Sequence, residues 1–179
     1  MRVYGMKSNT ASQVEKKQLL ICRHAKSSWL DTTLSDFERP LNKRGERDAP
    51  MMGRHLTERG IRPDLIMTSP AARAFATAVH YANHLGYPVD RLQRNPIQYA
   101  ATVSVLITLL QAIDSSVNTV LLVGHNPEST ALANALGGLT IDNIPTGGIV
   151  ALEFALRTWL ELKVGTGALL FFDYPKKHA

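Results

Sequence analysis

Four side chains of this 179-residue sequence have the chemistry to handle a phosphoryl group: Arg23, His24, Arg73 and His125. Each follows a short apolar run or stands at the start of the helix expected after one. Arginine can give two parallel hydrogen bonds to a phosphate, and its charge does not titrate off. A neutral imidazole can attack phosphorus, and neighbouring cations disfavour its protonated form. These residues therefore predict a site that holds a phosphoryl group while one histidine attacks it.

The order of the residues assigns their roles. His24 follows Arg23 directly at the end of the first predicted strand, so we assign it the attack on phosphorus. His125 is then expected to donate a hydrogen bond to the transferring group. Positioning and electrostatic stabilisation supply most of the rate in phosphoryl transfer, so we expect no cofactor and no metal. The sequence has no HExxH or DxD motif and no Cys/His pairing typical of metal sites.

Buried strands are the elements that must position these side chains. Residues 19–22 have the length of a strand, and their continuous apolar character suits a strand covered on both faces. The carboxyl end of such a strand is where an open α/β sheet binds ligands. Residues 119–123 repeat the pattern and run out into His125. Arg73 falls in the first turn of a helix predicted over residues 71–85, where a cation is better placed if an anion shares the helix N-terminus.

The rest of the chain alternates between the two kinds of element. Residues 27–40 form a long connection, and Asn42 is the candidate N-cap of a helix that ends at Gly60, with an offset first turn or a kink at Pro50. Further strands are predicted over 63–68, 89–92 and 149–154, helices over 102–113 and 128–136, and one or two last strands over 159–164 and 169–172. This alternation predicts a three-layer αβα domain with a largely parallel central sheet and antiparallel strands at its C-terminal end.

Length and composition limit the classes of protein to which this chain can belong. A chain of 179 residues with 45% hydrophobic residues fits one domain with a sizeable core. We expect residues 1–17 to be a disordered lead-in and residues 18–179 to form the domain. The N-terminus lacks the apolar segment of a secretory signal, and no apolar run approaches the roughly 18 residues of a membrane span. The single cysteine, Cys22, excludes an internal disulfide, so the sequence favours a cytoplasmic protein with no membrane contact.

The net charge of +5 and the pI near 9.5 raise the question of nucleic-acid binding. The surplus lies entirely in residues 1–60, which hold 12 Lys/Arg against 7 Asp/Glu, whereas residues 61–179 hold 8 of each. Acidic residues interleave with the basic ones, and no basic face with interspersed aromatic residues appears. We therefore expect a basic crevice for a phosphorylated ligand and no binding of nucleic acid.

Four segments of the sequence resemble the histidine phosphatase superfamily, and its compact, SixA-like phosphohistidine phosphatase branch in particular. They have the sequences LICRHAKSSW, RPLNKRG, TSPAARAFATA and VGHNP, and they span residues 20–29, 39–45, 68–78 and 123–127. The resemblance runs from about Gln18 to Tyr174, with the four motifs in the family's order. It implies the three-layer fold of phosphoglycerate mutase-like proteins and a reaction without a cofactor.

The resemblance also implies roles for individual residues. It implies a phosphohistidine intermediate at His24 and a phosphate pocket formed by Arg23, Arg73 and His125. Three more polar side chains within or beside the matching motifs are candidate substrate contacts: Lys26, Arg39 and Asn126. The chain is too short for the large helical lids of some relatives, so the site should be open enough for a phosphoryl group carried by a protein.

The sequence departs from the family pattern at two places. Ala25 stands where much of the superfamily has glycine, and alanine can replace glycine only where the backbone does not need a positive φ. Many relatives also place a glutamate proton donor after the third strand, but no Asp or Glu occurs here between Asp90 and Asp114. General acid catalysis typically contributes about 10² to 10⁴-fold, so an enzyme without it should favour leaving groups that depart easily.

Three carboxyl groups near the motifs are alternative candidates for the general acid: Asp36, Glu38 and Glu128. Each also has a simpler interpretation as a surface or capping residue. Glu128, for example, follows Pro127 in a predicted first helical turn, where acidic residues are favoured in any case.

The sequence thus predicts a cytoplasmic phosphatase that acts through a covalent phosphohistidine, with a phosphohistidine protein as the favoured substrate. A phosphatase of small phosphomonoesters is the second hypothesis. The third is a phosphate-binding interaction module without turnover, which the missing acid supports and the intact His24 opposes. A mutase is disfavoured by the small size of the chain and by the absent acid.

Overall fold

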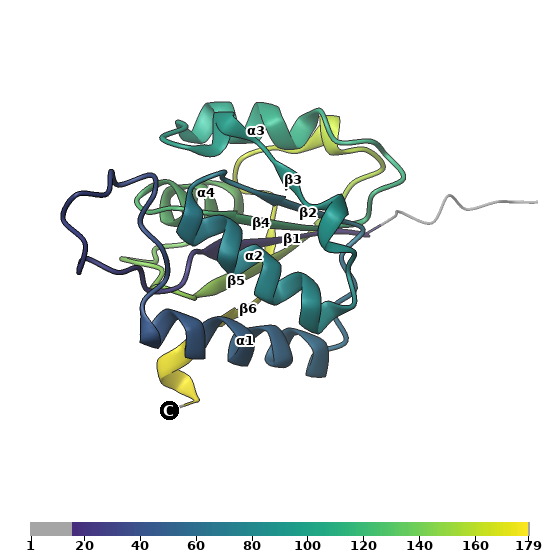
Figure 1. Ribbon diagram of the computed structural model, residues 1–179. Helices are drawn as coiled ribbons and strands as arrows, with labels where there is room; N and C mark the ends of the chain where they lie inside the picture. The colour runs from purple at the N-terminus through teal and green to yellow at the C-terminus, as the bar shows by residue number, and fades with distance from the viewer. Residues whose placement is uncertain (1–15, 179) are drawn as a thin grey trace, which may run out of the picture.

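The strand that carries Arg23 lies in the interior of a six-stranded sheet. The computed structural model describes residues 16–178 and gives the strand order β3-β2-β4-β1-β5-β6 (Figure 1). The strands are β1 (Lys16–Arg23), β2 (Leu65–Thr68), β3 (Gln93–Arg94), β4 (Thr119–Gly124), β5 (Ile149–Ala155) and β6 (Ala168–Asp173). The first four strands in this order are parallel to one another. Strand β5 pairs antiparallel with β1, and β6 pairs antiparallel with β5. The predicted largely parallel sheet with antiparallel C-terminal strands is confirmed.

Helices cover both faces of the sheet (Figure 1). Helices α1 (Lys43–Glu58) and α2 (Ala72–Leu85) pack on one face, and α3 (Val103–Gln111) and α4 (Glu128–Gly137) pack on the other. The side chains of β1 point alternately to the two faces of the sheet. Leu20 and Cys22 join the core under α1 and α2, whereas Leu19 and Ile21 join the core under α3 and α4. This double burial explains the continuous apolar run and gives the predicted three-layer αβα fold.

The register of the parallel strands brings their carboxyl ends to one edge. Arg23 pairs with Gly124, and Thr68 pairs with Val123. Just beyond these pairs, the His24 amide donates to the Gly124 carbonyl at 3.0 Å, and the Ser69 amide donates to the Val123 carbonyl at 3.0 Å. The residues that follow β1, β2 and β4 therefore leave the sheet side by side.

Two predicted strands are wrong. Residues 89–92 form a 3₁₀ turn, Val89–Arg91, that begins after Pro88 and exposes its charged residues, and the edge strand β3 follows it. Residues 159–161 form another 3₁₀ turn, in which the buried Trp159 indole donates to the Val117 carbonyl at 2.8 Å. Both segments carry apolar residues that anchor a turn to the core, a pattern that resembles a short strand in the sequence.

The ends and interior of the other elements also differ in detail from the expectations. Strand β1 begins at Lys16, two residues before the expected start of the domain, and the Lys17 ammonium is buried against Asn118 at 2.6 Å. The rest of the predicted lead-in lies outside the described residues.

Helix α1 runs through Pro50 from Lys43 to Glu58 without a break. None of the helices over residues 16–178 combines the length and apolar character that a membrane span requires.

The first turn of α1 is fitted against the backbone that follows His24. Asn42 caps the helix as predicted, since its side chain accepts a hydrogen bond from the Gly45 amide at 2.9 Å. The Asn42 amide itself donates to the Lys26 carbonyl at 2.9 Å. Glycine is required at position 45, because a Cβ there would lie 2.2 Å from the Lys26 carbonyl oxygen.

We expect Gly45→Ala to destabilise the protein by about 1–3 kcal/mol or more, because the added methyl group overlaps a backbone oxygen that cannot rotate away. Urea unfolding followed by circular dichroism measures this change. Arg54→Ala, an exposed substitution in the same helix, is the matched control and should leave the free energy of unfolding nearly unchanged. If the two variants were equally stable, the close approach of Gly45 to the Lys26 carbonyl would not limit which residue can stand at position 45.

Candidate active site

His24 is buried at the end of β1 and is held in one tautomer. Its Nδ1 lies 2.7 Å from the Ala25 carbonyl oxygen, and because a carbonyl can only accept, Nδ1 carries the proton. Its Nε2 accepts a hydrogen bond from Arg73 Nε at 3.1 Å. The lone pair of Nε2 therefore points at a guanidinium, which is the orientation that an attack on an arginine-bound phosphoryl group needs. Ala25 is buried without a positive φ, so the departure from glycine is accommodated.

Arg73 lies in the first turn of α2 and connects the two histidines. Besides its bond to His24, it places Nη2 3.4 Å from His125 Nδ1. The two imidazole rings stand with their centroids 5.1 Å apart. The prediction that a cation at this helix N-terminus belongs to the same crevice as both histidines is in accord with this geometry.

His125 is buried and is oriented by Ser69. Its Nε2 lies 2.8 Å from the Ser69 hydroxyl, and its Nδ1 faces Arg73, which can only donate. These two contacts place the ring proton on Nε2 and the lone pair on Nδ1. The Tyr99 ring approaches the imidazole edge-on, with centroids 5.5 Å apart. Sequence reasoning missed Ser69 and Tyr99, although the position of Ser69 directly after a buried strand was a usable signal.

Burial is the main reason that both imidazoles are neutral. Desolvation is the largest cause that lowers the pKa of His24 to about 3; the hydrogen bond to Ala25 opposes this shift, and His125, Arg73 and Arg23 add to it. Desolvation and Arg73 lower the pKa of His125 to about 4. The neighbouring arginines, which the sequence predicts to disfavour the protonated form, act in the same direction but contribute less than burial does.

Arg23 has one buried donor without a partner among the described residues. Its Nη1 donates to the Ile144 carbonyl at 2.8 Å and to the Asn143 side chain at 3.2 Å. Its Nε is buried and has no hydrogen-bond partner among residues 16–178. A buried donor without a partner is costly, and an oxygen of a bound phosphoryl group would satisfy it. Arg23 is thereby suited to the predicted role in phosphate binding.

The three additional substrate contacts predicted from the motifs have other partners in the structure. Asn126 donates to the Ile144 carbonyl at 3.1 Å, so it supports the segment that also holds Arg23. Arg39 is buried, donates to the Ser28 carbonyl at 2.9 Å and stacks on the Trp29 ring. Lys26 contributes its backbone carbonyl to the start of α1. Their observed contacts organise the loops around the site.

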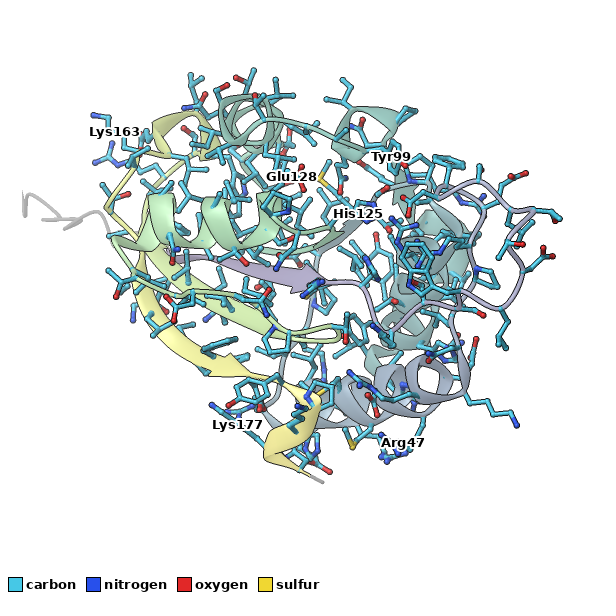
Figure 2. The ribbon with its side chains drawn as sticks, turned by 90° about the vertical axis from the view of Figure 1, so that its left-hand side faces the viewer. Arg47, Tyr99, His125, Glu128, Lys163 and Lys177 are labelled. Atoms are coloured by element: carbon cyan, nitrogen blue, oxygen red, sulfur yellow. The ribbon has the colours of Figure 1, made fainter. Side chains whose placement is uncertain are left out.

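Among the three candidate acids, Asp36 is the one that contacts the site. Its Oδ2 accepts from Arg73 Nη2 at 2.8 Å and from the Tyr99 hydroxyl at 3.1 Å, and its Oδ1 accepts from Arg39 at 2.8 Å. Arg73 Nη1 also donates to the backbone carbonyl of Asp36. The carboxylate of Glu38 instead accepts a hydrogen bond from the Ser35 amide. Glu128 is the first residue of α4, at the same end of the molecule as His125 and Tyr99 (Figure 2).

The Asp36 carboxyl is ionised in this arrangement. Partial burial alone raises its pKa, but the hydrogen bond and the charge of Arg73 outweigh burial. Tyr99 and Arg39 add to the lowering, so the pKa of Asp36 lies below its usual range. A carboxylate in this state has no proton to donate near neutral pH, and it occupies donors of Arg73 that a phosphoryl group would also use.

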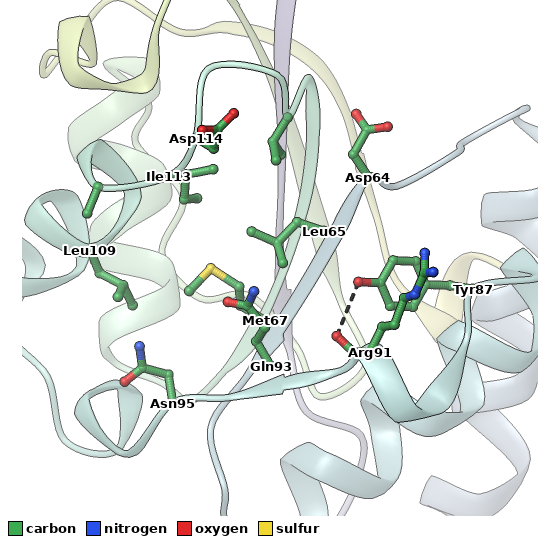
Figure 3. Close-up of a pocket in the computed structure, with 12 residues that line it drawn as sticks. Asp64, Leu65, Met67, Tyr87, Arg91, Gln93, Asn95, Leu109, Ile113 and Asp114 are labelled. Atoms are coloured by element: carbon green, nitrogen blue, oxygen red, sulfur yellow. Dashed lines mark hydrogen bonds between the residues drawn. The ribbon is translucent and has the colours of Figure 1, made fainter.

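A separate cavity of about 530 Å³ lies along the β3 edge of the sheet (Figure 3). Its lining is mostly apolar, with Leu65, Met67 and Leu109 facing one another, and it contains neither of the two site histidines. Within residues 16–178, no three His, Cys, Asp or Glu side chains gather in a way that could hold a metal ion.

A parallel sheet edge at which a neutral imidazole faces an arginine defines a phosphoryl-transfer protein, and comparison with known proteins specifies the family. A model of the histidine phosphatase superfamily (branch 1) matches residues 19–94. An uncharacterised protein of Mycobacterium tuberculosis is 31% identical over 164 residues, which cover 86% of this chain and 99% of that protein.

Solved structures agree with this match. The protein histidine phosphatase SixA complexed with tungstate gives a TM-score of 0.78 at 23% identity, covering 90% of this chain and 99% of that one. SixA of Agrobacterium tumefaciens gives a TM-score of 0.74 at 27% identity, covering 89% and 98%. The chain belongs to the histidine phosphatase superfamily, has a SixA-like fold, and is a phosphatase whose chemistry runs through a histidine.

We expect His24 and His125 to stay neutral when the folded protein is titrated from about pH 8 to about pH 5.5, whereas the same residues in the urea-denatured chain should titrate near about 6.5. Imidazole ¹⁵N shifts measured by NMR report the protonation state. Because only the unfolded chain takes up these protons, the free energy of unfolding should fall as the pH drops from about 6.5 toward 4. Midpoints near 6.5 in the folded protein would contradict the assigned burial.

We expect Asp36→Asn to bind inorganic phosphate or tungstate roughly two- to tenfold more tightly than the wild type, because the substitution removes a carboxylate that competes for Arg73. Isothermal titration calorimetry measures the dissociation constants. Glu38→Gln removes a carboxylate from the same loop without touching Arg73, so its affinity should equal that of the wild type. Weaker binding by Asp36→Asn would show that this carboxyl assists the anion.

Proposed function

We propose that this phosphatase removes the phosphoryl group from phosphohistidine in a protein, through a covalent intermediate on His24. The observation that carries the proposal is the geometry at Arg73, which donates to the buried Nε2 of His24 and also binds the carboxylate of Asp36. Such a site supports attack on phosphorus without helping the leaving group to depart. Phosphohistidine suits this site, because its leaving imidazole can already carry a proton on its second ring nitrogen.

The reaction then proceeds in two balanced steps. The Nε2 lone pair of His24 forms a bond to phosphorus while the bond from phosphorus to the substrate nitrogen breaks, and its electron pair remains on the leaving imidazole. In the second step, a water oxygen forms a bond to phosphorus while the bond from phosphorus to His24 Nε2 breaks, and its electron pair returns to Nε2. The attacking water releases a proton to solvent, and the product is inorganic phosphate. We assign the neutralisation of the phosphoryl oxygens in both steps to Arg73, which contacts His24, and to the unpaired Nε of Arg23.

We also propose that the reaction takes place in the cytoplasm and requires no cofactor. The one cysteine, Cys22, is buried in the core, and burial raises its thiol pKa far above the usual range. A thiol in this state is inert and indicates no disulfide chemistry. The arginines supply the charge stabilisation that a metal would otherwise provide.

We expect the wild-type enzyme to release phosphate from a histidine-phosphotransfer domain phosphorylated with phosphoramidate, and to do so more efficiently than from p-nitrophenyl phosphate. His24→Ala should lose turnover by on the order of 10³-fold or more and should not acquire the acid-labile phosphoryl label found on the wild type. His80→Ala, which removes a partly exposed histidine on α2, is the matched control and should retain both activities.

The same experiment separates the proposal from its alternatives. Efficient turnover of p-nitrophenyl phosphate with none of the phosphoprotein would favour a phosphatase of small phosphomonoesters. Binding of phosphate without label or turnover would leave a phosphate-binding interaction module. Undiminished turnover by His24→Ala would overturn the assignment of the nucleophile.

A further inference from the structure

The loop between β1 and α1 presents three exposed apolar side chains. The side chains of Trp29, Leu30 and Phe37 are 71%, 94% and 39% exposed, and we name them the apolar rim. The loop protrudes beyond the carboxyl edge of the sheet as the purple-to-blue segment of Figure 1. Apolar groups held in water this way commonly mark a surface that another molecule covers.

The apolar rim rests on a well-anchored base. The buried Arg39 guanidinium lies 3.2 Å from the centroid of the Trp29 ring, and its Nη2 donates to the Ser27 hydroxyl at 2.8 Å. The Phe37 carbonyl accepts a hydrogen bond from the Ala72 amide at the start of α2, at 3.0 Å. A partner that contacts a surface fixed in this way needs to order little of it on binding.

Two chains of contacts connect the apolar rim to the active site. The Phe37 ring packs edge-on against Tyr99 at 5.2 Å, and Tyr99 packs against His125 at 5.5 Å. Trp29 stacks on Arg39, which pairs with Asp36, the carboxylate that holds Arg73. The rim is therefore the outer border of the phosphoryl site.

The depth of the site determines what can reach it. His24, Arg73 and His125 are all buried, so a phosphoryl group carried by a protein must reach them on a side chain that extends past the border. When that side chain belongs to a protein, the surface around it comes to rest on the loop. A small phosphorylated molecule makes no such contact.

We propose that the apolar rim is the docking surface for the protein that carries the phosphohistidine. The proposal rests on the function proposed above and assigns a recognition surface to it. Carboxylates at Asp31 and Glu38 flank the apolar side chains, and hydrogen bonds from Thr33 and Ser35 keep their pKa values low. The partner should accordingly present an apolar patch flanked by Lys or Arg beside its phosphohistidine.

The test compares one leaving group on two carriers: a phosphorylated histidine-phosphotransfer domain and the free amino acid phosphohistidine. Leu30→Ser should lower kcat/KM for the phosphoprotein by about tenfold, and the double variant Trp29→Ser/Leu30→Ser should lower it further. Leu30→Ser should leave kcat/KM for free phosphohistidine within about twofold of the wild type. Leu160→Ser, at an exposed leucine in the 3₁₀ turn after β5, is the matched control.

Turnover of free phosphohistidine shows in each variant that the active site is folded. If Leu30→Ser and the double variant match Leu160→Ser on the phosphoprotein, the docking surface is wrong while the proposed function stands. If the variants lose both substrates equally, the loop acts on the chemistry and the docking role is likewise overturned. If the wild type cleaves p-nitrophenyl phosphate but not the phosphoprotein, the proposed function fails and the docking surface fails with it.

Discussion

The Arg73 guanidinium is the group on which the arrangement of the active site depends. It donates to Nε2 of His24, lies against His125 and binds the carboxylate of Asp36. Its position follows from its place in the first turn of α2, whose N-terminus abuts the sheet edge where β2 ends. A planar cation with several donors can make all these contacts at once, which a lysine ammonium could not reproduce. One side chain thus sets the spacing of both histidines and of the loop above them.

The electrostatics of the site follow from what surrounds this cation. The two imidazoles are neutral because they are buried, and a cation beside them reinforces that state without being its main cause. Asp36 balances the charge of Arg73, and Tyr99 and Arg39 fix the carboxylate in place. A phosphoryl oxygen that binds Arg73 competes with this carboxylate, so we expect phosphate affinity to reflect a difference between two ion pairs.

The sequence predicts the fold, and it places Arg23, His24, Arg73 and His125 at one sheet edge, because both depend on local patterns. Apolar strands that run out into Arg23, His24 and His125 identify the sheet edge, and a helix start identifies Arg73. The contacts of Tyr99 and Asp36 could not be predicted, since they depend on the paths that two separate loops take in space. Arg39 shows the same limit, because its motif suggests a ligand contact whereas packing under Trp29 buries it.

The pairing of β1 with β4 places Arg23 beside Gly124, two residues that lie about one hundred positions apart in the sequence. His24 and His125 are thus brought together by the pairing of strands that are distant in the sequence. In terms of folding, contacts of such long sequence separation carry a loop-closure cost in entropy and slow the formation of the native sheet. A slip of one residue between these strands would also send alternate side chains to the opposite face. Catalytic competence in this chain is consequently a property of the completed sheet, and partly folded forms of it lack the active site.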